Sequence, residues 1–260
     1  MKLKIVEHLA KHPFIKAAMD DIKPQLDKIY PEVLKRAEDG DWISKSESKM
    51  GDADWYRYDV FSKQTALISV LDRIVYAHAF LQKFPSPRTF EKEYEITQYI
   101  WIEYHFFHYM VNVVSLFDCL LILTNAVFRI GLKERACKPD TILKNHWVWQ
   151  VGFDKYLKKF ESITNKYKET RNIHLHRGKG KNIAQVLNSD NLSFLGMVSF
   201  LQLHKDEFLP KDIIDAGYKE EVVEISNRIE ADCHEIEDQL SEIFSFLIKI
   251  YLNKRPEINT

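Results

Sequence analysis

Residues Asn165–Asn182 read NKYKETRNIHLHRGKGKN, and the interpretation of the whole chain depends on them. It contains six lysines and arginines, two histidines and one acidic residue. Its first part has the character of a helix, and Gly178 and Gly180 then end that helix and open a loop. No other part of the chain gathers ionisable side chains in this way, so this segment is the first candidate for a functional site.

Within this stretch, the run RNIHLH at residues 171–176 resembles the Arg-x(4 to 6)-His signature of the HEPN superfamily. HEPN proteins are helical nucleotide-binding and RNA-cleaving domains, and an asparagine often follows the arginine in their signature. The resemblance implies an all-α fold, a catalytic pair of Arg171 and His176, and Asn172 as a supporting polar residue. His174 has no counterpart in the signature but shares a helical face with Arg171, so it is a secondary candidate.

These residue types suit the cleavage of RNA without a metal ion. The reaction needs a base for the 2'-hydroxyl proton, an acid for the leaving oxygen and positive charge beside the phosphorane. Histidine suits the first two tasks because its ordinary pKa of about 6.5 lies near the working pH. Arginine suits the third because its planar fork donates two parallel hydrogen bonds to phosphate oxygens. The motif therefore predicts a metal-independent ribonuclease.

The spacing of the motif raises a geometric question. In a continuous helix, Arg171 and His176 would point about 140° apart, while Arg171 would face His174 and Asn172 would face His176. Two arrangements would bring the pair together. Two copies of the chain could meet about a two-fold axis, as HEPN domains of this type usually do, or the helix could unwind before Gly178 and turn His176 back toward Arg171.

Further cations flank the motif, and we expect them to hold the RNA backbone on either side of the cut. An ordinary structural origin competes with this interpretation, because cations in the last turn of a helix are favoured by the helix dipole. The predicted phosphate-binding residues are Lys166, Lys168, Arg177, Lys179 and Lys181.

The composition limits the class of protein. A chain of 260 residues lies near the upper limit for one hydrophobic core, and eight glycines and eight prolines are few for this length, which favours helices. Hydrophobic residues make up 45% of the chain, enough for a packed interior. The net charge is -1, so affinity for nucleic acid must come from a local patch of cations.

The cysteines and the N-terminus bear on location. Cys119, Cys137 and Cys233 are far apart and form no CxxC pair, which argues against a zinc ribbon or a disulfide framework. The N-terminal residues meet His8 and Lys11 before any long apolar run, so they do not resemble a signal peptide. The expected location is the cytoplasm.

An apolar segment at 110–130 is about as long as a membrane-spanning helix. Asp118 lies near its middle, where a carboxylate would be costly in lipid, so we expect a buried helix and no membrane. His105 and His108 lie just before it on one helical arc. We expect His105, His108 and Asp118 to give polar support to the active surface or to a second subunit, although hydrogen-bonded core histidines are an equally good explanation.

The fold class expected from periodicity is all-α, a HEPN-like bundle of four to five main helices with an N-terminal helical extension. Two domains are expected, an N-terminal helical segment with an aromatic loop at 1–60 and the bundle at 61–260. Apolar residues at three- and four-residue spacing predict the main helices over residues 61–84, 90–130, 153–176 and 218–254.

Other parts of the chain give weaker signals. Pro13 suits a first helical turn, whereas Pro24 is expected to break or restart the helix. Residues 38–59 predict a long loop, and its aromatic side chains, Trp42, Trp55, Tyr56 and Tyr58, are expected to pack onto other groups. The helix at 90–130 would be about 60 Å long, so a kink or break is expected in it. Residues 183–216 are compatible with a short helix or a buried strand.

Two other classes of function compete with the nuclease. One is a non-catalytic HEPN-like module that binds RNA, a nucleotide or a protein partner such as an antitoxin. The other is a helical-bundle metal protein using His105, His108 and a carboxylate such as Asp118, although the Glu-x-x-His pairs of di-iron bundles are absent from that helix. The expected partners are RNA or a nucleotide and a second copy of the chain, and no metal or other cofactor is expected.

Overall fold

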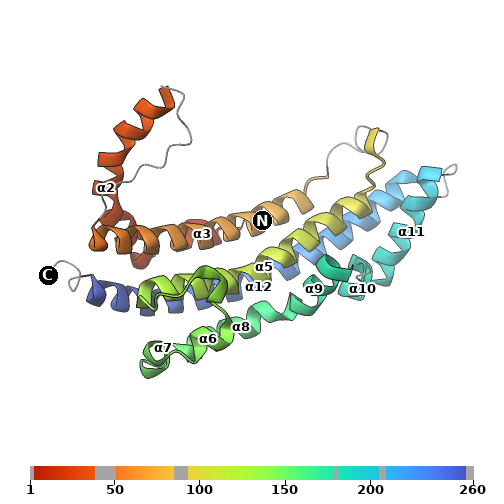
Figure 1. Ribbon diagram of the computed structural model, residues 1–260. Helices are drawn as coiled ribbons and strands as arrows, with labels where there is room; N and C mark the ends of the chain where they lie inside the picture. The colour runs from red at the N-terminus through yellow and green to blue at the C-terminus, as the bar shows by residue number, and fades with distance from the viewer. Residues whose placement is uncertain (1–2, 39–50, 85–92, 178–180, 205–208, 256–260) are drawn as a thin grey trace. The chain divides into compact units, whose positions relative to one another are not determined.

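A computed structural model describes residues 3–38, 51–84, 93–177, 181–204 and 209–255, without the side chains of 25, 28–34, 36–37, 174–177 and 202–204. Within these ranges the regular elements are all helices (Figure 1), which confirms the all-α prediction. The elements are α1 (Ile5–Leu9), α2 (Pro13–Glu38), α3 (Asp52–Leu81), α5 (Gln98–Phe128), η1 (Glu134–Ala136), α6 (Pro139–Leu143), α7 (His146–Gln150), α8 (Asp154–Thr164), η2 (Asn165–Tyr167), α9 (Lys168–Arg177), α10 (Ile183–Leu187), α11 (Asp190–His204) and α12 (Lys211–Lys254).

The chain divides into two compact units, and the helices α3, α5 and α12 each contribute residues to both. Unit 1 comprises Met1–Ile5, Ser69–Phe117 and Glu161–Glu237. Unit 2 comprises Val6–Ile68, Asp118–Phe160 and Asp238–Thr260. The division into an N-terminal segment at 1–60 and a bundle at 61–260 stays a prediction.

Unit 1 is a helical core that carries α9. Phe106 and Tyr109 of α5 and Ile229 of α12 are fully buried in it. The hydroxyl of Tyr218 on α12 donates to the carbonyl of Leu195 at 3.0 Å, which fastens α11 to α12. The start of α10 is held by α5, because the backbone N–H of Ile183 donates to the Glu103 carboxylate at 3.1 Å. The two helices that follow α9 in the sequence, α10 and α11, are therefore tied to this core.

Unit 2 joins the N-terminal helix α2 to α3 and to the end of α12. The ring of Phe14 packs against Phe244 with centroids 5.5 Å apart, and the amide of Gln64 donates to the Phe14 carbonyl at 3.1 Å. The Tyr251 hydroxyl donates to the Asp21 carboxylate at 2.7 Å. Aromatic packing and buried hydrogen bonds thus fix the first part of α2 in this unit.

Several expectations about element boundaries are wrong. Helix α2 continues through Pro24. Proline has no N–H for the carbonyl four residues earlier, but Pro24 is exposed, so that carbonyl can accept from water instead. Residues 52–59 belong to α3 and not to a loop, whereas 39–50 lie outside the described residues. The expected break after residue 90 is found at 95–97, where Glu95 has a φ of 54° and α5 starts anew at Gln98.

The predictions near the motif were partly confirmed. The helix expected at 153–176 is present but is interrupted, because η2 separates α8 from α9. The segment 183–216 contains α10, α11 and the start of α12, so its helical alternative is confirmed and a buried strand is wrong for the described residues. Periodicity could not choose there because α11 is apolar on buried and exposed faces alike.

Among the described residues, α5 is the helix whose length and composition would allow it to cross a membrane. In that apolar window, 72% of the residues are buried inside the structure.

Candidate functional site

The motif RNIHLH lies on α9, which directly follows the 3-10 turn η2 in unit 1. Thr164, at the end of α8, is fully buried and Tyr167, at the end of η2, is nearly so. Lys168 then has helical dihedrals, with φ at -62° and ψ at -44°, and begins α9. The change from α to 3-10 and back sets the direction in which α9 leaves the core.

A single carboxylate on α12, that of Asp232, binds the side chains of the two residues that precede α9. The hydroxyls of Tyr109 and Tyr167 both donate to Oδ2 of Asp232, each at 2.7 Å. The Lys166 ammonium forms an ion pair with Oδ1 of the same carboxylate. Asp232 is 6% exposed, so a nearly buried charge is matched by one cation and two hydroxyl donors.

Burial sets the titration behaviour of these groups. It raises the pKa of Tyr167, and the negative charge of Asp232 raises it further, while Arg228 opposes the shift. Burial likewise raises the pKa of Tyr109 well above its ordinary value, with Tyr167 and Asp232 adding to the effect. Both phenols therefore stay protonated at neutral pH and act as hydrogen-bond donors to the carboxylate.

Arg171 is partly buried one helical turn after Tyr167. Its Nε atom is buried and has no hydrogen-bond partner among the described residues. Asn172, the next residue, is exposed, as are Lys168 and Lys181. The guanidinium of Arg171 thus forms no ion pair within the described part of the chain, in contrast to the ammonium of Lys166.

The rest of the predicted catalytic and phosphate-binding set is only partly described. His174, His176 and Arg177 lie on α9, but their side chains are outside the described residues, and Lys179 lies outside them altogether. Because α9 is helical as far as Arg177, an unwinding of the helix before Gly178 is wrong. Positions 171 and 176 are therefore about 140° apart around the helix axis in one chain.

The residues predicted to give polar support occupy different environments. In unit 1, His105 is 8% exposed and its ring lies against Phe80 and Trp101, with centroids 5.2 and 4.4 Å away. His108, one turn later, is exposed and stacks on Tyr104. In unit 2, Asp118 is exposed. His105 is thus an aromatic-packed core histidine, and its Nε2 has no hydrogen-bond partner among the described residues.

A metal site would need several histidine, cysteine or carboxylate side chains in one place. No group of three or more such residues that could hold a metal ion occurs in the part of the chain that the structure describes. His105, enclosed by Phe80 and Trp101, offers no open coordination position there. Nothing in the described geometry thus favours the metal-protein alternative.

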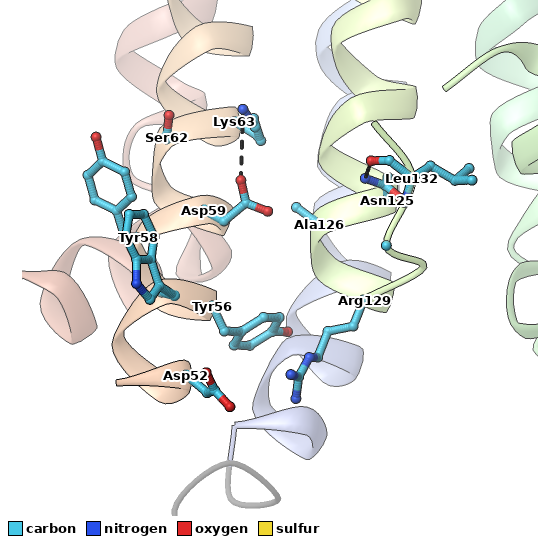
Figure 2. A pocket seen from close by; sticks show the side chains of 12 residues that line it. Asp52, Tyr56, Tyr58, Asp59, Ser62, Lys63, Asn125, Ala126, Arg129 and Leu132 are labelled. Atoms are coloured by element: carbon cyan, nitrogen blue, oxygen red, sulfur yellow. Dashed lines mark hydrogen bonds and ion pairs between the residues drawn. The ribbon is translucent and has the colours of Figure 1, made fainter. Parts of the chain in front are cut away.

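Unit 2 contains a cavity of about 650 Å³ between the start of α3 and the end of α5 (Figure 2). The guanidinium of Arg129 lies over the ring of Tyr56 at 5.6 Å, and the Tyr56 hydroxyl donates to the Val127 carbonyl at 3.0 Å. The Lys63 ammonium is paired with Asp59 and with Glu134. The cavity therefore has charges of both signs, largely balanced by each other.

The turn after α5 that borders this cavity is held in an uncommon conformation. Arg129 has a φ of 54°, and Gly131 has a φ of 82°, where glycine is the favoured residue. The side chain of Asn125 fixes the turn, since it both donates to and accepts from the backbone of Leu132 at 3.0 Å. Trp55 and Tyr58, also at the cavity, are 51% and 40% exposed. Trp55 and Tyr58 pack edge to face with centroids 5.9 Å apart and Tyr56 is buried, so the expectation that these aromatic side chains pack is confirmed for all three, while Trp42 lies outside the described residues.

Asp232, Tyr109 and Tyr167 were not among the site residues predicted from the sequence. A signal for Asp232 was present, because it lies three residues after Ile229 and four before Ile236, on the apolar arc of α12. An acidic residue on such an arc needs a donor from another element. Which element supplies that donor depends on tertiary packing, and the two tyrosines that do so lie 123 and 65 residues away.

One protein family matches this chain, and its description is HEPN_Cthe2314-like HEPN. The match runs over residues 63–244, which is 182 of the 260 residues, and it includes α9 and Asp232. No curated protein and no solved structure matches the chain significantly.

Proposed function

We propose, from the premise that this chain belongs to the HEPN_Cthe2314-like HEPN family, that it cleaves RNA without a metal ion and does so as a pair of identical chains. HEPN domains serve as nuclease, RNA-binding or toxin-antitoxin modules. The observation that carries the proposal is the position of the motif within the family match: Arg171, Asn172 and His176 lie on one described helix. Family membership by itself supports the broader assignment, a HEPN module that cleaves or binds RNA or belongs to a toxin-antitoxin pair.

The proposed roles follow from the chemistry of the side chains. His176 acts as general acid or base, because an imidazole can give and take a proton near neutral pH. Arg171 stabilises the charge on the phosphorane with its guanidinium, whose Nε has no hydrogen-bond partner among the described residues. Asn172 hydrogen-bonds the substrate or the catalytic histidine, and His174 is a second candidate for proton transfer.

The pairing of two chains follows from the helix geometry. The continuous α9 separates positions 171 and 176 by about 140°, so one chain does not turn both toward the same phosphate. Two α9 helices related by a two-fold axis would place Arg171 of each chain opposite His176 of the other. The proposed active site is therefore shared between two copies.

The proposed RNA contact uses the exposed cations around the motif. Lys168 and Lys181 are exposed and suited to phosphate contacts, and Arg177 and Lys179 remain predicted contacts. Lys166 differs, because Asp232 already neutralises its charge. We propose the cytoplasm as the location, since Cys119, Cys137 and Cys233 are far apart in the sequence and form no CxxC pair.

The test is the cleavage of a labelled single-stranded RNA in the presence of EDTA. The wild type should cleave, and His176→Ala should cleave about 100- to 10,000-fold more slowly while binding the RNA with similar affinity. His234→Ala, which removes an exposed histidine of α12, is the matched control and should cleave at the wild-type rate.

Two results would overturn the nuclease proposal. If His176→Ala cleaves as fast as the wild type, the activity comes from another site or from a contaminant. If the wild type binds RNA but leaves it intact under all conditions, the chain is a binding module of this family, and the search turns to a protein partner such as an antitoxin.

A further inference from the structure

The carboxylate of Asp232 joins three elements of unit 1 at one point. Oδ2 accepts from Tyr109 of α5 and from Tyr167 of η2, each at 2.7 Å, and Oδ1 is paired with Lys166 of η2. Two of these three donors belong to the last two residues before α9. The carboxylate thus has two contacts with η2, the segment that leads into the motif, and one contact with α5.

Burial strengthens the two tyrosine contacts, whereas the Lys166 side chain, at 35% exposed, reaches the carboxylate from the solvent side. The side chain of Asp232 is 8% exposed, Tyr109 is fully buried and Tyr167 is 2% exposed. A buried carboxylate that lost a donor would keep an unmet charge, so the arrangement resists partial opening. The Lys166 ammonium also lies 5.3 Å from the centre of the Tyr167 ring, which fixes the lysine over the same turn.

The position of this cluster relative to the motif gives it a consequence for catalysis. Tyr167 and Arg171 are four residues apart, on the same face of the chain and about 6 Å apart along a helix axis. A shift of the turn at Tyr167 would therefore move Arg171 and the rest of α9 with it. Displacements of about 1 Å in a catalytic group can lower a rate about 100-fold.

We infer that Lys166, Tyr167 and Asp232, here called the Asp232 anchor, are positioning residues that fix the start of α9. Lys166 then serves the reaction through geometry, with its charge committed to Asp232, and not by holding an RNA phosphate. The inference rests on the proposed function for its effect on rate, but the anchor itself is a property of the structure. Lys166 is therefore removed from the set of predicted phosphate contacts. Lys168 and Lys181 stay in that set.

A matched pair of variants tests the anchor. Tyr167→Phe removes the hydroxyl that ties Asp232 to η2, whereas Tyr109→Phe removes an equally short bond from the same oxygen to α5. Both lose one buried hydroxyl, and Tyr167→Phe also loses the contact of that hydroxyl with Arg228, so it should lower the melting temperature at least as much as Tyr109→Phe does. Tyr167→Phe should speed amide hydrogen exchange in residues 168–177 by about tenfold, and Tyr109→Phe should leave it near the wild-type rate.

Turnover of RNA gives a second measurement with the same pair. Tyr167→Phe should lower kcat about 10- to 100-fold while the Kd for RNA changes less than about twofold. A loss of kcat that is equal in the two variants would mean that general destabilisation is responsible, and that would overturn the inference. So would unchanged exchange across α9 in Tyr167→Phe.

A second pair separates positioning from phosphate binding. Lys166→Met should lower kcat and loosen α9 while leaving the salt dependence of RNA binding unchanged. Lys168→Met removes an exposed cation two residues later, and it should weaken binding and reduce the slope of log K against log salt by about 0.7 to 1. If Lys166→Met instead behaves as expected for Lys168→Met, with normal exchange in α9, then Lys166 is a phosphate contact and the inference fails.

The two proposals fail in distinguishable ways. If the wild type cleaves no RNA, the proposed function fails, yet the exchange rates of α9 in Tyr167→Phe and Tyr109→Phe still decide whether the anchor exists. If the wild type cleaves RNA and His176→Ala does not, but Tyr167→Phe matches the wild type in rate and exchange, the nuclease stands and the anchor is refuted.

Discussion

Two polar side chains of unit 1 are in opposite situations, although both are at least partly buried. Asp232 accepts from three donors, so its charge is fully committed to the fold. The Nε of Arg171 is buried with no hydrogen-bond partner among the described residues. Such an unpaired donor costs stability, a cost that is tolerated where a substrate or second chain supplies the acceptor. The contacts of Asp232 assign it a structural role, and the unpaired Nε of Arg171 is consistent with the catalytic role proposed for that residue.

The pH dependence of stability should show the effect of burying His105. Burial among Phe80 and Trp101 lowers the pKa of His105, and the charge of His108 lowers it further. The unfolded chain takes up a proton at this residue as the pH falls below about 6.5, and the folded chain does so only at lower pH. Stability is therefore full above pH 6.5 and is lost as the pH falls below it.

Urea unfolding at pH 7.5 and pH 5.5 measures this effect. His105→Phe should lose less stability between these two pH values than the wild type does, because phenylalanine keeps the ring packing and has no proton to bind. His12 and His78, whose pKa values burial also lowers, leave a residual dependence in the variant. His146→Phe, at an exposed position on α7, is the control, and an equal loss in His105→Phe and the wild type would refute the assignment.

For the helices, the sequence correctly predicted which long ones exist. It predicted much less well where each helix begins, ends or is interrupted. Apolar spacing located α3, α5, α8 and α12, because each has one face against a core. It did not show η2, since the energy difference between a 3-10 and an α turn is small and depends on the contacts of Tyr167. The continuation of α2 through Pro24 depends likewise on solvent access and not on propensity.

The contact of α11 with α5 gives a testable prediction. A Cβ added to Gly196 would lie 2.7 Å from the ring of Tyr99, closer than unbonded carbon atoms can approach. Gly196→Ala gains about 1 kcal/mol of helix propensity but incurs an overpacking cost of about 1–3 kcal/mol. The variant should therefore be less stable by up to about 2 kcal/mol in urea unfolding.

Gly217→Ala is the matched control for this prediction. Its added Cβ would meet the tip of the Leu195 side chain at 3.0 Å, and a leucine can shift its end carbons where a tyrosine ring pressed on the helix cannot. We expect Gly217→Ala to be neutral or to stabilise by up to about 1 kcal/mol. Equal effects in the two variants would show that the Tyr99 contact is not tight.

At the scale of the whole molecule, the family could be predicted from six residues, and the architecture of the site could not. The motif RNIHLH indicated a HEPN protein because arginine, asparagine and histidine occur at a fixed spacing on one helix, and the match over residues 63–244 confirmed the family. The Asp232 anchor was missed because it combines η2 and α12, which are more than 60 residues apart in the sequence. Contacts between distant segments are set by packing, on which local periodicity gives no information.

The proposal that the active site is shared concerns two chains together. If the active site is shared, Arg171 acts on a phosphate together with His176 of a second copy. A heterodimer of the Arg171→Ala and His176→Ala chains then keeps one complete Arg and His pair across the interface, while each variant homodimer has none. If each chain instead works alone, neither chain in the heterodimer has a complete site.

The most direct measurement is the rate of RNA cleavage in EDTA by that heterodimer, produced by co-expression and purified through two different tags. We predict a rate about 10-fold or more above either variant homodimer, because one acid–base group of a working pair contributes about 100-fold or more. A heterodimer as inactive as the two homodimers, beside an active wild type, would contradict the shared site.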